Sequence, residues 1–443
     1  MKIQLSDHFT YQRLLHFCLP SIVMMIFTSI YGVVDGLFVS NFVGKIPFAA
    51  INLVMPFIMI LGGFGFMIGT GGSALIAKTL GEGNHKLASR YFSMLIIMTV
   101  ILGLFLTTIG IVFARRVSIL LGATDVMLDD CVIYLRTVLL FISPFMLQNV
   151  FQSFLVTAQK PHAGLIVTII AGLTNMSLDA LFIVVFRWGV AGAALATGIS
   201  QCIGGLLPLI LFLGKNDSLL HLVPTHLEWR PFFLSCTNGM SELMGNISSS
   251  IVSMLYNFQL LNYAGENGIA AYGVLMYVQF IFIAVFFGYT IGVGPVIGYH
   301  YGAGNHAELK NLLRKSLKLN IITGISMTIL ANLFAGALSR IFVGYDPELY
   351  AMTKSAFHIF ALSFLVCGIN IFASAFFTAL NNGLVSAVIS FLRTLVFQVG
   401  SVLILPAFLG LTGIWLSNTF ADLMAMLISI IFLAAMRKRY HYA

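Results

Sequence analysis

Two short stretches of this sequence decide how the rest is interpreted. Residues 71–85 read GGSALIAKTLGEGNH, and residues 292–306 read GVGPVIGYHYGAGNH. Both stretches end in Gly-x-Gly-Asn-His, and the second lies 221 positions after the first. The same separation, without a gap, aligns further positions along the chain: Asn41 with Asn262, Gly44 with Gly265, Thr157 with Thr378, Gly189 with Gly410, and Gly192 with Gly413. One register held over so much of the chain indicates a tandem duplication.

The composition indicates a membrane protein. Of 443 residues, 59% are hydrophobic and only 9% are charged, whereas about a quarter of the residues in a soluble protein are charged. The apolar residues form long runs, such as Leu53 to Ile76 and Leu95 to Val112. A helix of about 20 apolar residues spans the hydrocarbon core, and it satisfies its own backbone hydrogen bonds there. We therefore predict an all-α membrane protein.

Polar breaks such as Gly81 to Asn84 and Asn381 to Gly383 divide the chain into twelve apolar segments. Each half holds six of them, so both halves enter the membrane in the same sense, as parallel repeats do in many secondary transporters. We predict a six-helix N-terminal lobe at residues 1–213, a cytoplasmic strap at 214–231 and a six-helix C-terminal lobe at 232–443. The predicted spans are 14–40, 46–78, 88–114, 129–158, 163–186, 190–213, 232–262, 268–300, 309–335, 350–379, 384–407 and 411–436.

The basic residues predict the orientation. Fifteen Lys and Arg residues fall on the side of the predicted termini, including Lys2 and Lys215, and six fall on the opposite side. By the positive-inside rule both termini are cytoplasmic, in a multi-pass protein of the cell membrane. The net charge of +8 sits at helix ends, so it does not predict nucleic-acid binding. The five scattered cysteines and the absence of phosphate-loop or H-E-x-x-H motifs predict no disulfide framework, metal site or ATP-driven pump.

Five ionisable residues lie well inside predicted spans, where charge is expensive and usually functional. None has a charged counterpart at the equivalent position of the other half: Asp35, Asp179, Glu242, Arg393 and Asp422. The scaffold is therefore symmetric, while its buried charges are not.

Asp35 and Asp179 both belong to the N-terminal lobe, in the outer halves of the first and fifth spans. Tyr31 and Asn175 precede them by one helical turn on the same faces. Apolar surroundings favour the protonated form of a carboxyl group, so these residues are candidates for proton exchange in competition with substrate. The alternative is that each carboxyl group shapes a helix contact.

Glu242, Arg393 and Asp422 lie near the bilayer midplane in the C-terminal lobe. One arginine with two carboxylates could form a mutually neutralising cluster. Buried charges are usually paired for energetic reasons alone, so we interpret Arg393 and Asp422 as a secondary charge cluster, in the first place a structural ion pair. Glu242 remains open between that role and a second cation site.

The chain resembles the multidrug and toxic compound extrusion (MATE) family over nearly its whole length. Residues 31–40, YGVVDGLFVS, are similar to the family's first helix with its aspartate, here Asp35. Residues 175–183, NMSLDALFI, with the Gly-rich segment from Gly189 to Ser200, resemble the fifth-to-sixth helix signature. Residues 270–274, AAYGV, and 295–304, PVIGYHYGAG, are similar to the eighth-helix pattern.

This resemblance implies a V-shaped pair of six-helix lobes and an antiporter that exports organic cations or amphipathic drugs, driven by inward H⁺ or Na⁺. It implies no cofactor beyond that coupling ion. The set of Asp35, Asn175 and Asp179, with Tyr31 beside it, is similar to bacterial and archaeal members with an aspartate site in the N-terminal lobe. Glu242 could match a seventh-helix acid that holds a cation in some relatives, so the coupling ion stays open.

Two other functions compete with drug export. A flippase for lipid-linked saccharides, in the same superfamily, would be expected to line its cavity with several Arg or Lys residues, whereas Arg393 is nearly alone at depth. An intramembrane enzyme would need a nucleophile or acid–base constellation that the sequence does not offer. We expect a monomer whose partners are its small-molecule substrates and the membrane lipids.

Overall fold

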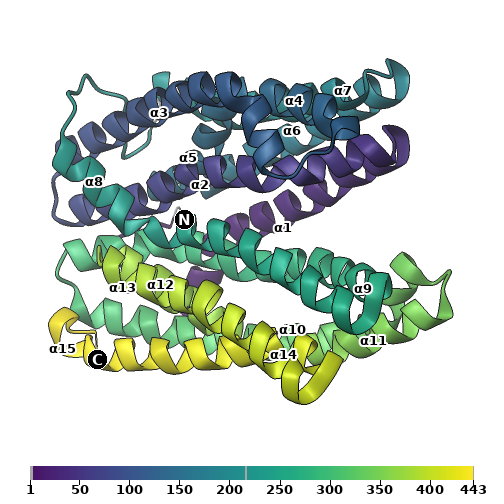
Figure 1. Ribbon diagram of the computed structural model, residues 1–443. Helices are drawn as coiled ribbons and strands as arrows, with labels where there is room; N and C mark the ends of the chain where they lie inside the picture. Colours follow the sequence, from purple (N-terminus) through teal and green to yellow (C-terminus); the bar gives the residue numbers. More distant parts are fainter. Residues whose placement is uncertain (1–2, 215–216, 443) are drawn as a thin grey trace.

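The computed structural model describes residues 3–214 and 217–442, and the regular structure of these residues is helical. The helices form two bundles that lie side by side, α1 to α7 in one and α9 to α14 in the other (Figure 1). The molecule is a twelve-span, V-shaped pair of six-helix lobes, as predicted. Lys2, Lys215 and residues 215–216 of the predicted strap lie outside the described residues.

The N-terminal lobe begins its third helix with an asparagine cap. Asn84 Oδ1 accepts a hydrogen bond from the Leu87 backbone N–H, and Asn305 Oδ1 does the same for Glu308 in the other lobe, both at 3.1 Å. The repeated Gly-x-Gly-Asn-His motif is therefore a turn and helix cap used twice. The helices of this lobe are α1 (Tyr11–Phe42), α2 (Lys45–Gly81), α3 (His85–Leu120), α4 (Asp125–Leu139), α5 (Ile142–Thr157), α6 (Pro161–Asp179), the π-helix η1 (Ala180–Val185) and α7 (Gly189–Leu213).

The C-terminal lobe has two very long helices that each contain a sharp turn. Gly265 and Gly410 hold φ values of 62° and 57° inside them, a conformation that glycine adopts without strain. The equivalent glycines of the N-terminal lobe, Gly44 and Gly189, also have positive φ and separate two helices. Divided at these turns, the long helices complete the twelve predicted spans. The elements are α8 (Trp229–Asn238), α9 (Met240–Gly302), α10 (His306–Val343), α11 (Pro347–Phe360), the 3₁₀ turn η2 (Ala361–Ser363), α12 (Phe364–Ala379), α13 (Gly383–Phe391), the π-helix η3 (Leu392–Phe397), α14 (Gln398–Ala435) and α15 (Arg437–Tyr440).

The fourth span, predicted at 129–158, is not one straight helix. It is broken into α4 and α5, which meet at an angle of 56°. Pro144 lies just past the break and has no N–H to donate to the carbonyl of Leu140 four residues earlier. The equivalent residue of the other lobe is Leu365, and that span passes through the short 3₁₀ turn η2 instead.

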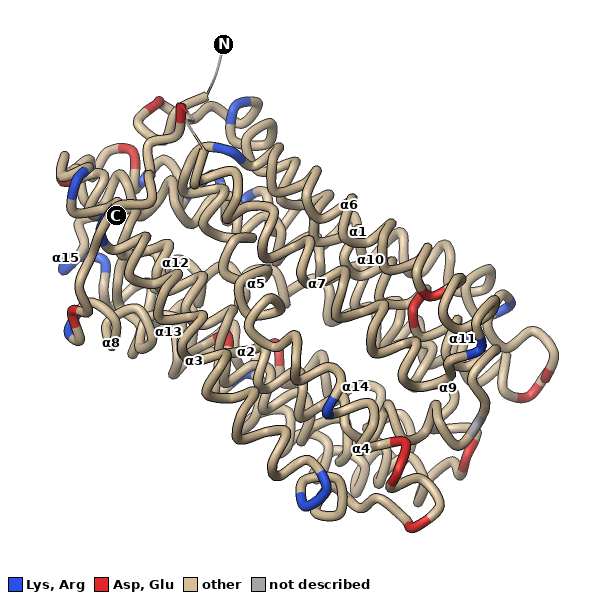
Figure 2. The backbone as a smooth tube through the Cα atoms, turned by 90° about the horizontal axis from the view of Figure 1, so that it is seen from above, with Lys and Arg blue, Asp and Glu red and all other residues tan. Residues whose placement is uncertain are grey.

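Charged residues gather at the two ends of the bundles, and few lie in the long middle (Figure 2). This distribution fits a protein that crosses a bilayer. Both ends of the described chain lie at the same end of the helices: Phe9 contacts Glu308 at the start of α10, and His441 packs against His306. The cytoplasmic placement of that end remains a prediction.

The lobes pack most tightly at this same end, between α2 and the second half of α9. A Cβ on Gly81 would come within 2.0 Å of the Tyr299 carbonyl, and a Cβ on Gly302 would come equally close to the Lys78 carbonyl. These two contacts are related by the 221-residue repeat, so they flank the pseudo-twofold axis. The interface between the lobes, called the seam below, is thus closed at the end that holds the termini.

Candidate ion and substrate site

The N-terminal lobe brings Asp35 of α1 and Asp179 of α6 together. The two carboxyl groups lie within electrostatic reach of each other and of Asn175, one turn earlier on α6. Asp179 is fully buried and Asp35 is partly buried. Neither carboxyl group forms an ion pair with a basic residue among the described residues. Asp35 lies within hydrogen-bonding reach of Asp179 and Asn175, but with both carboxyl groups ionised, Asp35 Oδ1 and the two oxygens of Asp179 are buried without a donor among the described residues. Unpaired buried acceptors of this kind are rare and call for a ligand or proton.

Tyr31 lies one helical turn before Asp35 on α1, as the sequence predicted. Its side chain sits beside Gln148 of α5 and within electrostatic reach of Asp35. Gly172 makes this arrangement possible, because a Cβ there would come within 2.5 Å of the Phe27 ring and 2.9 Å of the Tyr31 ring. Because Gly172 has no side chain, α1 and α6 approach closely, and Asp35 and Asp179 come together inside the lobe.

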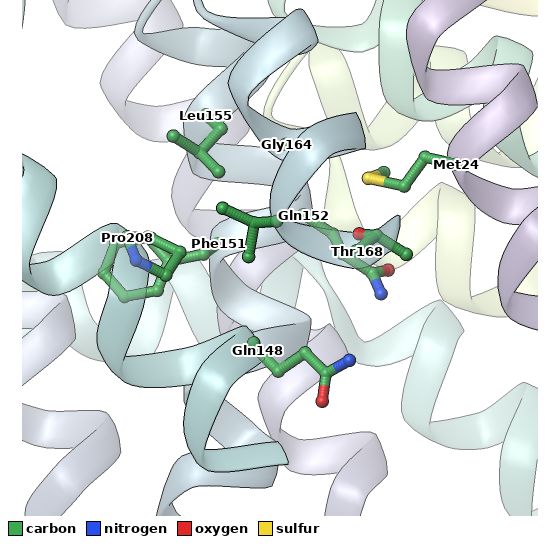
Figure 3. A pocket seen from close by; sticks show the side chains of 10 residues that line it. Met24, Gln148, Phe151, Gln152, Leu155, Gly164, Thr168 and Pro208 are labelled. Atoms are coloured by element: carbon green, nitrogen blue, oxygen red, sulfur yellow. The ribbon is translucent and has the colours of Figure 1, made fainter. Parts of the chain in front are cut away.

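A small pocket lies between these two aspartates and the end of the lobe that holds the termini. Gln148, Gln152 and Thr168 supply its polar groups, and Met24 closes it on the side of α1 (Figure 3). Gln152 Oε1 is buried and has no hydrogen-bond partner among the described residues. The interior of the N-terminal lobe is therefore polar below the acids as well as around them.

Sequence reasoning missed Gln148, Gln152 and Tyr134. Tyr134 is buried in α4 within electrostatic reach of both aspartates. The two glutamines are spaced by four residues on one helix face, a periodic polar signal inside an apolar span that could have revealed them. The π-helix η1 begins directly after Asp179, and such irregular turns are frequent at functional sites.

The C-terminal lobe holds its buried charges in a different way. Arg393 Nε donates to Asp422 Oδ1 at 2.7 Å, and Asp422 is 3% exposed. Asn370 Nδ2 donates to the Asp422 carbonyl at 2.8 Å, and Ser429 Oγ donates to Asn370 Oδ1 at 3.2 Å. This lobe therefore contains a closed ion pair, in line with a structural role.

Glu242 belongs to neither group. It lies in the first turn of α9, partly buried, and its carbonyl accepts a hydrogen bond from Asn246 Nδ2 at 3.0 Å. Asn246 itself packs against α2, since it lies 3.3 Å from a Cβ placed on Gly63. Within residues 3–214 and 217–442, Arg393 forms its ion pair with Asp422 and none with Glu242, so the three-residue cluster considered from the sequence is not formed. Glu242 instead sits on a helix that faces the other lobe.

Comparison with known proteins now decides the family. The MatE family model matches the chain twice, at residues 20–181 and 243–404, once in each lobe. The chain belongs to the MatE family. It is 25% identical to the multidrug export protein MepA of Staphylococcus haemolyticus over 436 residues, covering 97% of this chain and 94% of that protein.

Solved MATE structures show the same fold. A crystal structure of MATE in complex with MaL6 superposes with a TM-score of 0.93, at 21% identity and with 98% of both chains covered. A multidrug resistance MATE family transporter in an outward-facing conformation superposes with a TM-score of 0.92, also at 21% identity and 98% coverage of both chains. These likenesses establish the multi-pass architecture of the MatE protein described here.

Proposed function

We propose that this MatE protein is a secondary antiporter that exports organic cations or other amphipathic drugs in exchange for H⁺ or Na⁺. The unneutralised pair of carboxyl groups at Asp35 and Asp179 carries the proposal. Two like charges about 4 Å apart repel by about 4 kcal/mol even at an effective dielectric constant of 20. A pair buried in this way is stable only when a proton or a cation compensates it.

The donor set fits either coupling ion. Two carboxyl groups and the amide oxygen of Asn175 are hard oxygen ligands of the kind that alkali and alkaline-earth cations prefer. The same carboxyl groups bind protons. An organic cation that approached this site would compete for the same negative charge, and this competition couples drug release to ion entry.

The two lobes would supply the movement. In our proposal residues 1–213 and 232–443 rock against each other while the strap at 214–231 joins them, and both termini face the cytoplasm. The close approach of Gly81 to Tyr299 and of Gly302 to Lys78 shuts one end of the seam. Opening that end and closing the other would expose the carboxyl pair to alternate sides, as in other transporters built from parallel repeats.

The relatives support the choice of substrate class. The similar Staphylococcus proteins are named multidrug export proteins. Glu242, which lies on the inter-lobe helix without an ion-pair partner among the described residues, is our candidate for a second cation contact in the C-terminal lobe. A flippase for lipid-linked saccharides is less well supported, because Arg393 is already paired with Asp422 and does not offer its charge to a pyrophosphate. An enzymatic role has even less support, and we expect the transporter to be a monomer.

The test is efflux of a fluorescent organic cation from proteoliposomes under pH and Na⁺ gradients imposed separately. The wild type should respond to one gradient, and Asp35→Asn should not. Asp129→Asn is the matched control, because Asp129 is exposed at the start of the fourth span. Equal gradient-driven efflux in Asp35→Asn and wild type would contradict the role of the carboxyl pair. The absence of cation movement in the wild type would leave the flippase as the better function.

A further inference from the structure

The segment before α1 crosses from one lobe to the other. Residues 3–10 lead into α1 of the N-terminal lobe, yet they bind to the start of α10 in the C-terminal lobe. Glu308 Oε1 accepts a hydrogen bond from the Phe9 backbone N–H at 2.9 Å, and Glu308 Oε2 lies 2.6 Å from His8 Nδ1. Lys315 Nζ donates to the Phe9 carbonyl at 2.6 Å. Both backbone polar groups of one residue are thus held by side chains of the other lobe.

Apolar packing seals the same contact. Leu5 and Phe9 are fully buried, and the Phe9 ring meets the rings of Phe17 and His300 edge to face. His300 is only 2% exposed, and its ring lies within hydrogen-bonding reach of the Asp7 backbone and within electrostatic reach of Glu308. His300 therefore belongs to the same closed contact, and release of residues 3–10 would expose it to water.

The strap makes the equivalent crossing in the opposite direction. It leads into α8 and the C-terminal lobe, but it binds α3 of the N-terminal lobe. Arg90 Nη2 donates to Glu228 Oε1 at 2.8 Å, and Ser93 Oγ accepts from the Val223 backbone N–H at 2.9 Å. Arg90 occupies the position that Asn311 occupies in the repeat, and Asn311 Nδ2 likewise donates to the crossing segment, at the Phe9 carbonyl. Two crossed contacts therefore bracket the closed end of the seam.

The strap and residues 3–10 are held by separate sets of side chains. The strap is held by several side chains spread along α3, including Ser89, Arg90, Ser93 and Met94. In the contact of residues 3–10, Glu308 binds two groups, the Phe9 backbone N–H and His8 Nδ1, while Asn311 and Lys315 each donate to the Phe9 carbonyl. A change at Glu308 can therefore weaken the second contact and leave the first in place.

We propose that residues 3–10 are a releasable latch, held by Glu308, that keeps the lobes closed at the end of the termini and sets the balance between the closed and open arrangements of that end. The latch rests on the lobe motion of the proposed function. It acts at the start of α1, the helix that carries Asp35, so its release removes one of the contacts that hold that helix against the C-terminal lobe. The packing of α1 against Gly288 and Gly292 of α9 stays in place, and the strap still joins the lobes.

The experiment measures the distance across the closed end. Spin labels are placed by Lys86→Cys on α3 and Lys310→Cys on α10, two exposed positions in different lobes. Cys202 and Cys236 are replaced by alanine, because the other three cysteines are buried. Pulsed electron paramagnetic resonance on the whole protein in lipid nanodiscs then compares wild type with Glu308→Gln and with Lys315→Met. Asp7→Asn is the control, since the Asp7 carboxylate accepts a hydrogen bond from Gln4 within the same segment, and the substitution leaves the Asp7 backbone beside His300 unchanged.

The latch predicts a larger population with long distances in Glu308→Gln, by about tenfold, because hydrogen bonds to charged groups shift a two-state balance by that order. Lys315→Met should shift it in the same direction, and it serves as the readout if Glu308→Gln does not fold. Asp7→Asn should match the wild type. Distance distributions that are identical in the wild type and in every folded latch variant, at all pH values and with or without an organic cation, would overturn the latch. Gradient-driven efflux that depends on Asp35 would survive that result, so the two proposals fail separately.

Discussion

The two lobes hold their buried charged side chains in opposite ways. In the N-terminal lobe, Asp35 and Asp179 lie within hydrogen-bonding reach of each other, and neither forms an ion pair with a basic residue in the described part of the chain. In the C-terminal lobe, Arg393 and Asp422 neutralise each other, and Asn370 hydrogen-bonds the same aspartate. The two lobes therefore share one scaffold, but it is the C-terminal lobe in which the buried charges neutralise each other. In our proposal, the interior of the N-terminal lobe is the one that binds and releases the coupling ion.

The largest effect is expected from a substitution in the carboxyl pair of the N-terminal lobe. Asp179→Asn removes one of the two like charges and with it the repulsion that favours binding of a compensating proton or cation. Gradient-driven efflux should fall at least about tenfold, the change that corresponds to 1.4 kcal/mol, while the thermal unfolding temperature stays the same or rises. Efflux rates in proteoliposomes and thermal unfolding in detergent check the two halves of the prediction. A large loss of stability would instead show that Asp179 is structural.

At the ion pair of the C-terminal lobe, substitutions should change the stability of the protein rather than its ion-coupled efflux. Asp422→Asn leaves Arg393 buried without its counter-charge and should lower the free energy of unfolding by about 3–5 kcal/mol. The double variant Arg393→Met/Asp422→Leu removes both charges and should recover most of that loss, with ion-coupled efflux retained. Unfolding in denaturant and the efflux assay give both quantities. Loss of ion coupling in a stable double variant would mean that the closed pair takes part in transport.

A smaller effect is expected where the lobes differ in side-chain size. Gly172 is aligned with Arg393 in the repeat and lets Tyr31 approach α6. Gly172→Ala places a Cβ into the Phe27 and Tyr31 rings and should destabilise the protein by about 1–3 kcal/mol, as overpacking does. Gly164→Ala on the same helix is the matched control, because its Cβ would meet nothing closer than 3.6 Å. Thermal unfolding of both variants decides the matter, and equal stabilities would argue against the close helix contact.

The smallest effect concerns the hydroxyl group of Tyr31. Tyr31→Phe keeps the ring and removes the polar group that lies beside Gln148 and near Asp35. A single hydrogen-bonding group contributes about 0.5–1.5 kcal/mol, so efflux should fall about two- to tenfold in a fully folded protein. Tyr277→Phe, at a residue 40% exposed in the other lobe, should leave efflux unchanged. The same loss in both variants would point to a general effect on the membrane protein.

Much of the architecture could be predicted from the sequence because it follows from simple constraints. Apolar runs of bilayer length predict spans, and the glycine register predicts the repeat. Pro144 is one of several prolines that can kink a predicted span, and the sequence alone does not say which of them breaks its span, as Pro144 does between α4 and α5. The turns at Gly265 and Gly410 fall at predicted loops that are almost absent, since one glycine suffices for each.

The candidate site could be predicted only in part. Buried acids stand out in apolar spans, so Asp35 and Asp179 were identified, and the charges of Arg393 and Asp422 suggested their pairing. Uncharged polar residues such as Gln148 and Gln152 stand out less, because an amide in a span has many structural uses. The isolation of Glu242 from Arg393 depends on how helices rotate about their axes, which a single sequence does not determine.

The most direct test is ion displacement by substrate from the purified protein. An organic cation is added to wild type, Asp35→Asn and Arg393→Met/Asp422→Leu in weakly buffered detergent solution, and released protons and displaced Na⁺ are both measured. The account predicts release of one of these ions from the wild type and from the double variant, and none from Asp35→Asn. Undiminished release from Asp35→Asn, or its loss only in a folded double variant, would contradict the assignment of ion coupling to the N-terminal lobe.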